Sequence, residues 1–314
     1  MSLKKVYNIV GIGANVCDTL ISLDEYPLED TKRRAQDIVQ SGGGPCATGL
    51  VAAAKLGENC AYIGALADDA GGSFLLEDNE RYGVSNELVR VQKGAASFSS
   101  YVLLGQKNAS RTCVFHRGDV KFDSLDESQR QAIRDAKLLM VDGNYLEAAI
   151  EGARIARESG TLVLYDAGGL YDGVSKLLPY IDILIPSEEY SLGITGCQNA
   201  DDAAKKLYET YRPKVVIITQ GKRGGLMYDG KEITRYPIID LEVVDSNGSG
   251  DVFHGAYAFA MCKGYDYQKA CLFSSAVSSL KCTGMGSRRS VPEFYKVIET
   301  LKEYGYNEFE EDME

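Results

Sequence analysis

Short apolar runs alternate with helix-patterned segments along the second half of the chain. The runs rich in Val, Ile and Leu predict strands at 138–142, 161–166, 181–185 and 215–219. Between them, apolar residues recur at helical spacing at 146–158, near 172–178 and at 199–211. This alternation predicts an α/β fold with a mostly parallel central sheet and helices on both faces. Such sheets bind ligands at the carboxyl ends of their strands, where the sequence places Asp142, Asp166, Ser187 and Thr219.

The first half of the chain has shorter apolar runs and more alternation between apolar and polar positions. The pattern predicts a helix near 70–82, edge-strand material at 32–40, and strands at 6–10, 15–22, 60–65 and 88–91. Two further runs, 97–104 and 111–115, flank the polar stretch 106–110 and predict a β-hairpin. The hairpin and the strands near 15–40 are expected to form a small separate sheet.

The stretch Gly248-Ser249-Gly250 lies between a run of β-branched residues and a long helix pattern at about 250–262. Small residues let the backbone approach a ligand closely, and the free N–H groups at the start of a helix attract an anion. Asp251 falls in the first turn of that helix. Its carboxylate either caps the helix or accepts the proton of an alcohol that attacks a bound phosphoryl group.

Composition narrows the class of ligand. The chain has 314 residues, of which 45% are apolar, enough for one large core. The formal net charge is −11, and an acidic tail at 305–314 contributes to it. An acidic chain without a basic stripe binds nucleic acid and anionic membranes poorly, and no apolar stretch is long enough for a membrane span. We expect a small-molecule ligand, with no nucleic acid and no membrane as partner.

The cysteines and histidines indicate the compartment. Eight scattered cysteines without a C-x-x-C pair are typical of reduced, buried thiols. With His116 and His254 as the two histidines, the sequence does not favour a His/Cys zinc site. The first residues lack the apolar segment of a signal peptide. These features predict a cytoplasmic location.

The segment Asp245 to Gly255 reads D-S-N-G-S-G-D-V-F-H-G. It resembles the C-terminal signature of the ribokinase-like (PfkB) carbohydrate kinases, D-T-x-G-A-G-D-x-F-x-G. The resemblance implies an ATP-dependent kinase that phosphorylates a hydroxyl of a small sugar or sugar-like molecule, with ATP and Mg²⁺ as cofactors. It implies that Asp251 is the catalytic base and that the anion hole is made by the amides of Gly248, Ser249 and Gly250. The fold would be a single ribokinase-like domain, residues 1–314, with a lid from about 15–40 and 95–118.

The glycine-rich stretch that opens the next helix is similar to the N-terminal signature of the same family. Gly42-Gly43-Gly44 precedes a helix pattern that ends near Gly57, and Thr48 stands where the family has an asparagine. Asp18 fits the aspartate that binds sugar hydroxyls. The substrate-binding residues implied are Asn15, Asp18, Gly42, Gly43, Gly44 and Thr48. Because this loop has no Lys or Arg, we expect an unphosphorylated acceptor.

The loop from Thr219 to Gly224 resembles the family loop that contacts nucleotide phosphates. The nucleotide-binding residues implied are Thr219, Gly221, Gly224 and Ser246. Toward the end of the chain, the resemblance also implies a loop for a monovalent cation such as K⁺, formed by Asp245, Gly286 and Ser290.

The segment Pro186 to Tyr190 resembles the family's N-x-x-E segment, which organises magnesium. Ser187 and Tyr190 replace its asparagine and its glutamate. Glu189 or Glu188 would then hold Mg²⁺ through water, since this ion keeps much of its hydration shell. Surface acids at a helix start are the alternative interpretation.

Other interpretations stay open. A nucleoside kinase of the same fold would need an apolar shelf for the base, which Phe98, Tyr101 and Phe115 could offer. A catalytically silent sugar-binding protein would explain the departures from the family pattern, but the intact Gly-Ser-Gly-Asp segment argues against it. Arg111 and Arg117 border the hairpin and either reach a ligand or stay solvated at the strand edge. Exposed edges near 32–40 and 97–115 permit the homodimer that the resemblance implies.

Overall fold

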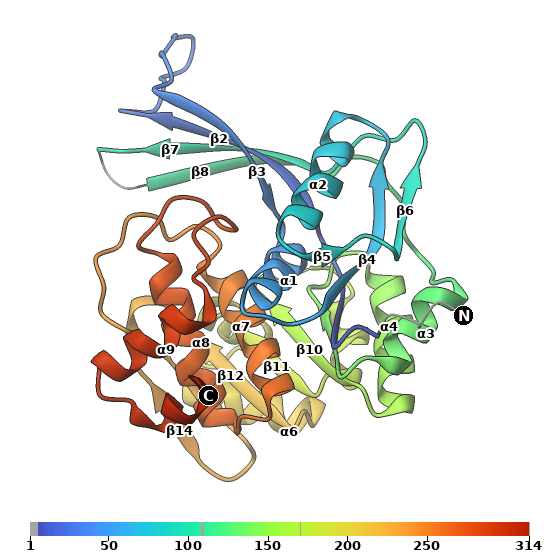
Figure 1. Ribbon diagram of the computed structural model, residues 1–314, viewed down its shortest axis with the longest axis vertical. Helices are drawn as coiled ribbons and strands as arrows, with labels where there is room; N and C mark the ends of the chain where they lie inside the picture. The colour runs from blue at the N-terminus through green and yellow to red at the C-terminus, as the bar shows by residue number, and fades with distance from the viewer. Residues whose placement is uncertain (1–5, 108–109, 170, 314) are drawn as a thin grey trace.

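The computed structural model describes residues 6–107, 110–169 and 171–313, which form two sheets of unequal size (Figure 1). In this part of the chain the larger sheet has ten strands in the order β14-β13-β12-β11-β10-β9-β1-β4-β5, with β6 beside β4. The strands are β1 Ile9–Ile12, β4 Cys60–Ala67, β5 Val84–Ser85, β6 Val89–Gln92, β9 Leu138–Val141, β10 Leu162–Ala167, β11 Ile183–Pro186, β12 Val215–Thr219, β13 Gly225–Tyr228 and β14 Ile233–Tyr236.

The centre of this sheet is parallel because its strands are short apolar runs that are buried on both faces. β1 pairs in parallel with β4 and β9, and β10 pairs in parallel with β9 and β11. Within β1, Ile9 faces one core, and Val10 and Ile12 face the other. At one edge, the β12–β13 and β13–β14 pairs are antiparallel. The predicted α/β fold with a mostly parallel sheet is confirmed.

Helices cover both faces of the sheet. The core that contains Ile9 is covered by α1 Pro45–Lys55, α7 Ser249–Lys263, α8 Tyr267–Lys281 and α9 Phe294–Glu303. The opposite core is covered by α3 Glu127–Asp135, α4 Leu146–Ser159 and α6 Ala200–Tyr211. Two more helices, α2 Ala70–Arg81 and α5 Glu188–Thr195, lie at the carboxyl ends of β4 and β11. In the described residues no helix has the length and apolar character that a bilayer crossing requires.

The smaller sheet has the order β3-β2-β7-β8 and consists of β2 Val16–Leu23, β3 Asp37–Gly43, β7 Ser99–Gly105 and β8 Ser110–His116. β2 and β7 pair in parallel, and the other two pairs are antiparallel. Figure 1 shows this sheet projecting from the body above the start of α7 and α1. The predicted small separate sheet is therefore confirmed, and we call it the lid. The tip of its hairpin, residues 108 and 109, lies outside the described residues.

Several predicted elements differ from the structure at their ends. β3 begins only at Asp37, so residues 32–36 are irregular. The helix expected near 172–178 is two 3-10 turns, Val174–Lys176 and Leu178–Tyr180, since Pro179 lacks the N–H that a continuous helix needs. The acidic tail is not extended over its described part: Asn307–Met313 forms a 3-10 helix whose Phe309 is buried in the core.

Candidate active site

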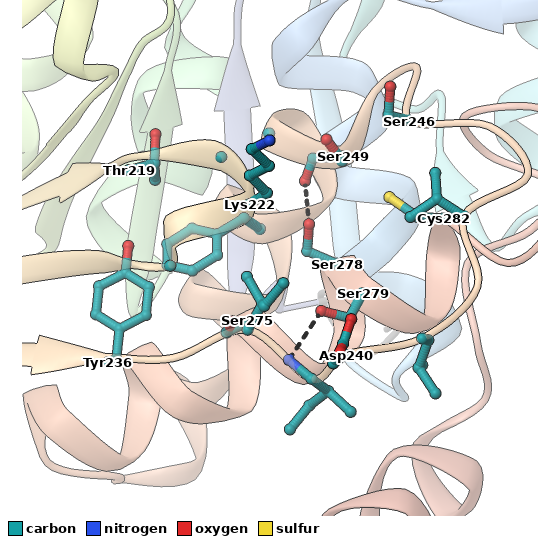
Figure 2. A pocket seen from close by; sticks show the side chains of 18 residues that line it. Thr219, Lys222, Tyr236, Asp240, Ser246, Ser249, Ser275, Ser278, Ser279 and Cys282 are labelled. Atoms are coloured by element: carbon teal, nitrogen blue, oxygen red, sulfur yellow. Dashed lines mark hydrogen bonds between the residues drawn. The ribbon is translucent and has the colours of Figure 1, made fainter. Parts of the chain in front are cut away.

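Two cavities meet at the N-terminus of α7. One, of about 390 Å³, lies between the lid and the body, and we call it the lid cavity. The other, of about 460 Å³, lies between the β12–β13 turn, residues 238–243 and helices α7 and α8, and we call it the helix cavity (Figure 2). Gly248 and Asp251 line the lid cavity, whereas Ser249 and Gly250 line the helix cavity. The segment that joins the cavities is therefore the one predicted to bind an anion.

The backbone at this junction is turned toward the cavities by Gly248. This residue caps α7 with a φ of 73°, a conformation that glycine adopts without strain. The first N–H groups of a helix have no carbonyl of their own helix to bond. The Ser249 N–H donates a 3.3 Å bond to the Ser246 carbonyl, whereas no described residue accepts from Gly250. The start of α7 thus keeps free donors and a positive dipole end for an anion.

Asp251 lies half-buried in the first turn of α7, on the wall of the lid cavity. Burial raises the pKa of its carboxyl group, and the positive charges of His254 and Arg111 oppose that shift. Among the described residues, none makes a hydrogen bond or ion pair with the Asp251 carboxylate. It is an available proton acceptor beside the free amides.

His254 lies one turn further along α7 and is buried beneath Asp251. Its Nδ1 lies 2.6 Å from the carbonyl oxygen of Gly250, and its Nε2 lies 2.9 Å from that of Ile185. Both ring nitrogens therefore face carbonyl oxygens, which can only accept a hydrogen bond. Nδ1 also lies 3.2 Å from Oδ2 of the buried Asp166. Burial raises the pKa of Asp166 to about 7, against the opposing charge of His254.

Asp142, at the end of β9, has a structural task. Its Oδ2 accepts from the N–H groups of Ala14, at 2.8 Å, and Cys46, at 3.1 Å. Its Oδ1 accepts from the N–H group of Asn144 at 2.9 Å. The carboxylate therefore fixes the turn after β1 and the start of α1, the two segments that carry the lid into place.

Asp18 projects from β2 into the lid cavity, as predicted for a residue that binds an acceptor. The hydroxyl of Ser100 on β7 donates to its Oδ1 at 2.6 Å. Burial raises the pKa of Asp18 to about 6, although the Ser100 hydrogen bond and Arg288 lower it. A Cβ at Gly43 would overlap Oδ2 of Asp18, so this position requires glycine.

Of the predicted substrate-binding residues, Gly43 and Gly44 also line the lid cavity, whereas Asn15, Gly42 and Thr48 lie behind its wall. These three surround a buried arginine, Arg288, which the sequence did not single out. Arg288 donates to Asn15 Oδ1 at 2.9 Å, to the Gly43 carbonyl at 2.6 Å and to Thr48 Oγ1 at 3.4 Å. Its charge is paired with Asp78 of α2 at 2.7 Å. A Cβ at Gly42 would overlap both members of this pair.

The lid supplies two cations to the lid cavity. Arg111 and Arg117 both line it, which favours the interpretation that they reach a ligand. Phe98 and Phe115 line it as well. Tyr101 points to the other face of the lid and is 54% exposed, so it is not part of the apolar shelf that a nucleoside base would need.

The four predicted nucleotide-binding residues line the helix cavity: Thr219, Gly221, Gly224 and Ser246. Figure 2 shows Thr219, Lys222 and Ser249 around one end of this cavity and Tyr236 and Ser275 around the other. The apolar part of its wall comes from residues such as Ile238, Leu241, Val243 and Phe253. The cavity thus offers polar atoms beside the start of α7 and an apolar surface further away.

The loop predicted to bind a monovalent cation already contains an ammonium group. Asp245 Oδ2 accepts from the Gly286 N–H at 2.8 Å. The fully buried Lys281 donates from Nζ to the Asp245 carbonyl at 2.8 Å, and Nζ lies 3.7 Å from Oδ2. Burial lowers the pKa of Lys281, and Asp245 opposes this. The Ser290 hydroxyl donates to the Gly286 carbonyl.

The predicted magnesium residue lies apart from both cavities. Glu189 is exposed at the start of α5 and lines neither cavity. Glu188 accepts from Gln220 at 2.7 Å and pairs with Arg223, so it supports the β12–β13 turn. Ser187 caps α5 through its bond from the Tyr190 N–H, and Tyr190 is buried. Among the described residues no cluster of three metal-ligating side chains occurs.

Known proteins resemble this chain along nearly its whole length. Residues 12–293 match the family described as "pfkB family carbohydrate kinase". The chain is 25% identical over 332 residues to 5-dehydro-2-deoxygluconokinase of Clostridium perfringens, across 98% of this chain and 95% of that protein.

Solved structures share the fold. Ribokinase of Arabidopsis thaliana, in complex with ribose and ATP, matches with a TM-score of 0.84 and 24% identity, over 95% of this chain and 99% of that chain. A protein of E. coli provisionally called ribokinase II, in complex with ATP and Mg²⁺, matches with a TM-score of 0.84 and 19% identity, over 95% and 100%. The chain belongs to the pfkB family of carbohydrate kinases, transferases that phosphorylate sugar hydroxyls.

Proposed function

We propose that this kinase transfers the γ-phosphoryl group of ATP to a hydroxyl of a small, unphosphorylated sugar or sugar-like molecule. The acceptor would bind in the lid cavity and ATP in the helix cavity. One observation carries this proposal: the segment 248–251, with its free amides and its carboxylate, forms part of the wall of both cavities. A phosphoryl group that passes from one cavity to the other must pass this segment.

In this proposal Asp251 accepts the proton of the acceptor hydroxyl as its oxygen attacks the γ-phosphorus. The bond from phosphorus to the bridging oxygen of ADP breaks, and the amides at the start of α7 bind the charge on the transferring group. The raised pKa of Asp251 makes it a better proton acceptor than an ordinary carboxylate.

Asp18 would hold two hydroxyls of the acceptor in place. The Ser100 hydroxyl bonds one oxygen of its carboxylate, and Gly43 leaves room for the other, so the side chain is oriented toward the cavity. An acceptor that is held in the reactive orientation loses less entropy in the transition state, and such positioning lowers the activation free energy of enzymes by several kcal/mol. The lid also excludes water, which would otherwise compete for the phosphoryl group.

Magnesium would reach the site with the phosphates of ATP. Mg²⁺ commonly takes one or two carboxylates and completes its shell with water and phosphate oxygens. Of the carboxylates near the start of α7, Asp251 lines the lid cavity, whereas Asp166 is buried against His254 and lines neither cavity. The ion would therefore be held mainly by phosphate oxygens and water, near Asp251. The ion supplies charge neutralisation to the transferring group. Glu189 could act only through water, as its exposed position requires.

The test is ADP release from Mg·ATP with a panel of pentoses, hexoses, ketoses, sugar acids and nucleosides. We expect turnover with one class of acceptor, and a loss of about 10²–10⁴-fold in kcat in Asp251→Asn. Asp202→Asn, in the first turn of α6, is the matched control and should keep full activity. If no acceptor gave ADP while sugars raised the melting temperature of both proteins equally, the chain would be a binding protein instead.

The relatives differ in the acceptor that their names state. One name gives 5-dehydro-2-deoxygluconate, a sugar acid, and the other gives ribose, a neutral sugar. The choice between these classes depends on the side chains that line the lid cavity of this chain.

A further inference from the structure

The lid cavity holds two guanidinium groups that a neutral acceptor does not require. Arg111 and Arg117 both line it, together with the carboxylates Asp18 and Asp251. Among the described residues neither arginine takes part in an ion pair with Asp or Glu. The lid therefore presents two exposed guanidinium groups, neither of them in an ion pair, to the space for the acceptor.

Arg117 is held in place without being neutralised. Its guanidinium lies over the ring of Phe98 at 5.9 Å and over the ring of Tyr171 at 5.5 Å. Its Nη1 donates to Asn144 Oδ1 at 3.1 Å, and the Asn144 side chain in turn donates to Asp142 Oδ1 at 3.1 Å. Two rings and one amide fix the plane of the guanidinium, while its other N–H groups have no partner among the described residues.

Arg111 lies at the opposite end of this arrangement. Its Nη1 donates to Asn247 Oδ1 at 2.6 Å, and Asn247 precedes the Gly248 turn of the anion site. Its charge is close enough to Asp251 to lower the pKa of that carboxyl group. Arg111 is thus placed to contact the transferring phosphoryl group. Arg117 lies away from the anion site and is not needed for phosphoryl transfer.

We propose that the acceptor is a sugar acid and that Arg117 binds its carboxylate, a subsite that deepens the proposed function and rests on it. Carboxylate oxygens match the planar donor geometry of a guanidinium, and such charge-assisted bonds are short and strong. An acidic ligand would otherwise be repelled by Asp18 and Asp251, which share the cavity. A neutral sugar would leave the free N–H groups of Arg117 to water, whereas a carboxylate would bond them directly.

A carboxylate fits better than a phosphate at this place. Lysine is absent from the residues that line the cavity, and the glycine turn at 41–49 carries no cation. Arg111 is engaged by Asn247, so a second phosphate would meet a single guanidinium and an amide. One positive charge matches a carboxylate of charge −1.

The test compares matched acceptors: D-gluconate, 2-keto-D-gluconate and 2-keto-3-deoxy-D-gluconate, the neutral sugars glucose and fructose, and the phosphate ester fructose 6-phosphate. Initial rates with Mg·ATP are measured for the intact protein, Arg117→Gln, Arg117→Lys and Arg33→Gln. Arg33 is the control because this exposed lid arginine pairs with Glu25 and does not line the cavity.

We expect at least one acid to be preferred over its neutral counterpart. Arg117→Gln should raise KM for the acid about 10–100-fold, with a smaller change in kcat. Arg117→Lys should recover part of that loss, and Arg33→Gln should change nothing. The rate with neutral sugars should fall less in Arg117→Gln than the rate with the acid.

Three results would overturn the carboxylate subsite. They are a neutral sugar used as well as any acid, an Arg117→Gln variant that loses acid and neutral acceptors equally, and turnover with the phosphate ester alone. Calorimetric binding of the acids without ATP separates this failure from failure of the kinase proposal. Acids that bind the intact protein and not Arg117→Gln support the subsite even if no ADP forms.

Discussion

Asp18 shows how one buried carboxyl group sets the pH range of the site. Its pKa of about 6 lies above the ordinary value of 3.8 because the side chain is buried, and the Ser100 hydroxyl opposes that shift. A protonated Asp18 loses an acceptor for the sugar hydroxyls. We therefore expect kcat/KM to fall as the pH is lowered through about 6.

Ser100→Ala tests this assignment. Without its hydrogen bond the ionised form of Asp18 is less favoured, so the acid limb of kcat/KM should move to higher pH. Ser99→Ala, which changes the neighbouring residue on the other face of β7, should leave the limb in place. A pH profile of Ser100→Ala that matches the intact protein would show that another group controls the limb.

A rise in pH is expected to change the stability of the protein and its activity in opposite directions at Asp18. Because the folded pKa of Asp18 is raised from 3.8 to about 6, the native state binds this proton more tightly than the unfolded chain. The contribution of Asp18 to the free energy of unfolding therefore falls as the pH rises through that window. At neutral pH, Asp18 is therefore ionised and able to accept hydrogen bonds, and its burial lowers the free energy of unfolding.

Single residues were predictable where their role follows from neighbours in the sequence. Asp251 and Gly248 stand in one turn, so the pattern of small residues before a helix was enough to predict their place at the start of α7. His254 also belongs to that helix, but its partners Asp166 and Ile185 come from two other strands. Nothing in the spacing of the sequence brings these residues together.

At the scale of elements, α8 contributes a fixed cation to the loops around the start of α7. Lys281 at its end binds the Asp245 carbonyl, and Asp245 in turn accepts from the Gly286 N–H and the Asn247 N–H. An ammonium group at this place supplies the positive charge that a bound monovalent cation would bring. We therefore expect the loop of Asp245, Gly286 and Ser290 to work without K⁺.

We expect kcat to be the same in K⁺, Na⁺ and tetramethylammonium salts at equal ionic strength. Lys281→Met should destabilise the fold by about 3 kcal/mol, since Asp245 is then left largely buried without its cation. Lys296→Met, at an exposed site on α9, serves as the control. Activation of the intact protein by K⁺ would contradict the role given to Lys281.

The element pattern of the fold followed from the sequence more closely than its packing did. Short apolar runs predicted the parallel strands correctly, because a strand that is buried on both faces must consist almost entirely of apolar residues. The lid hairpin was predictable too. Which of its side chains face the cavity was not predictable. Whether Arg111 and Arg117 point to solvent or to the cavity depends on the twist and the position of a sheet that touches the body at one end.

At the scale of the molecule, the buried Arg288 joins segments that are far apart in the sequence. It comes from the loop before α9 and holds Asn15, the Gly43 carbonyl and Asp78 of α2. Removing one partner of a buried pair leaves the other charge uncompensated. The wall of the lid cavity at Gly43 and Gly44, which we call the acceptor floor, and the overall stability are thus coupled through one side chain.

Arg288→Met should lower the free energy of unfolding by about 3–5 kcal/mol and raise KM for the acceptor. Urea unfolding and initial rates measure the two effects. Arg289→Met, at the exposed neighbouring position, should alter neither. An Arg288→Met protein with unchanged stability and unchanged KM would remove Arg288 from the acceptor floor.

Because Arg288 lies near the end of the chain, it also affects when the acceptor site can form during synthesis on the ribosome. The residues that it holds, from Asn15 to Asp78, leave the ribosome long before residue 288 does. Chains grow at about 5–20 residues per second, and their N-terminal parts begin to fold first. A nascent chain that ends before Arg288 therefore has the lid and Asp18 but lacks the cation that supports the floor. Its acceptor should protect it from proteolysis only after release of nearly the complete polypeptide.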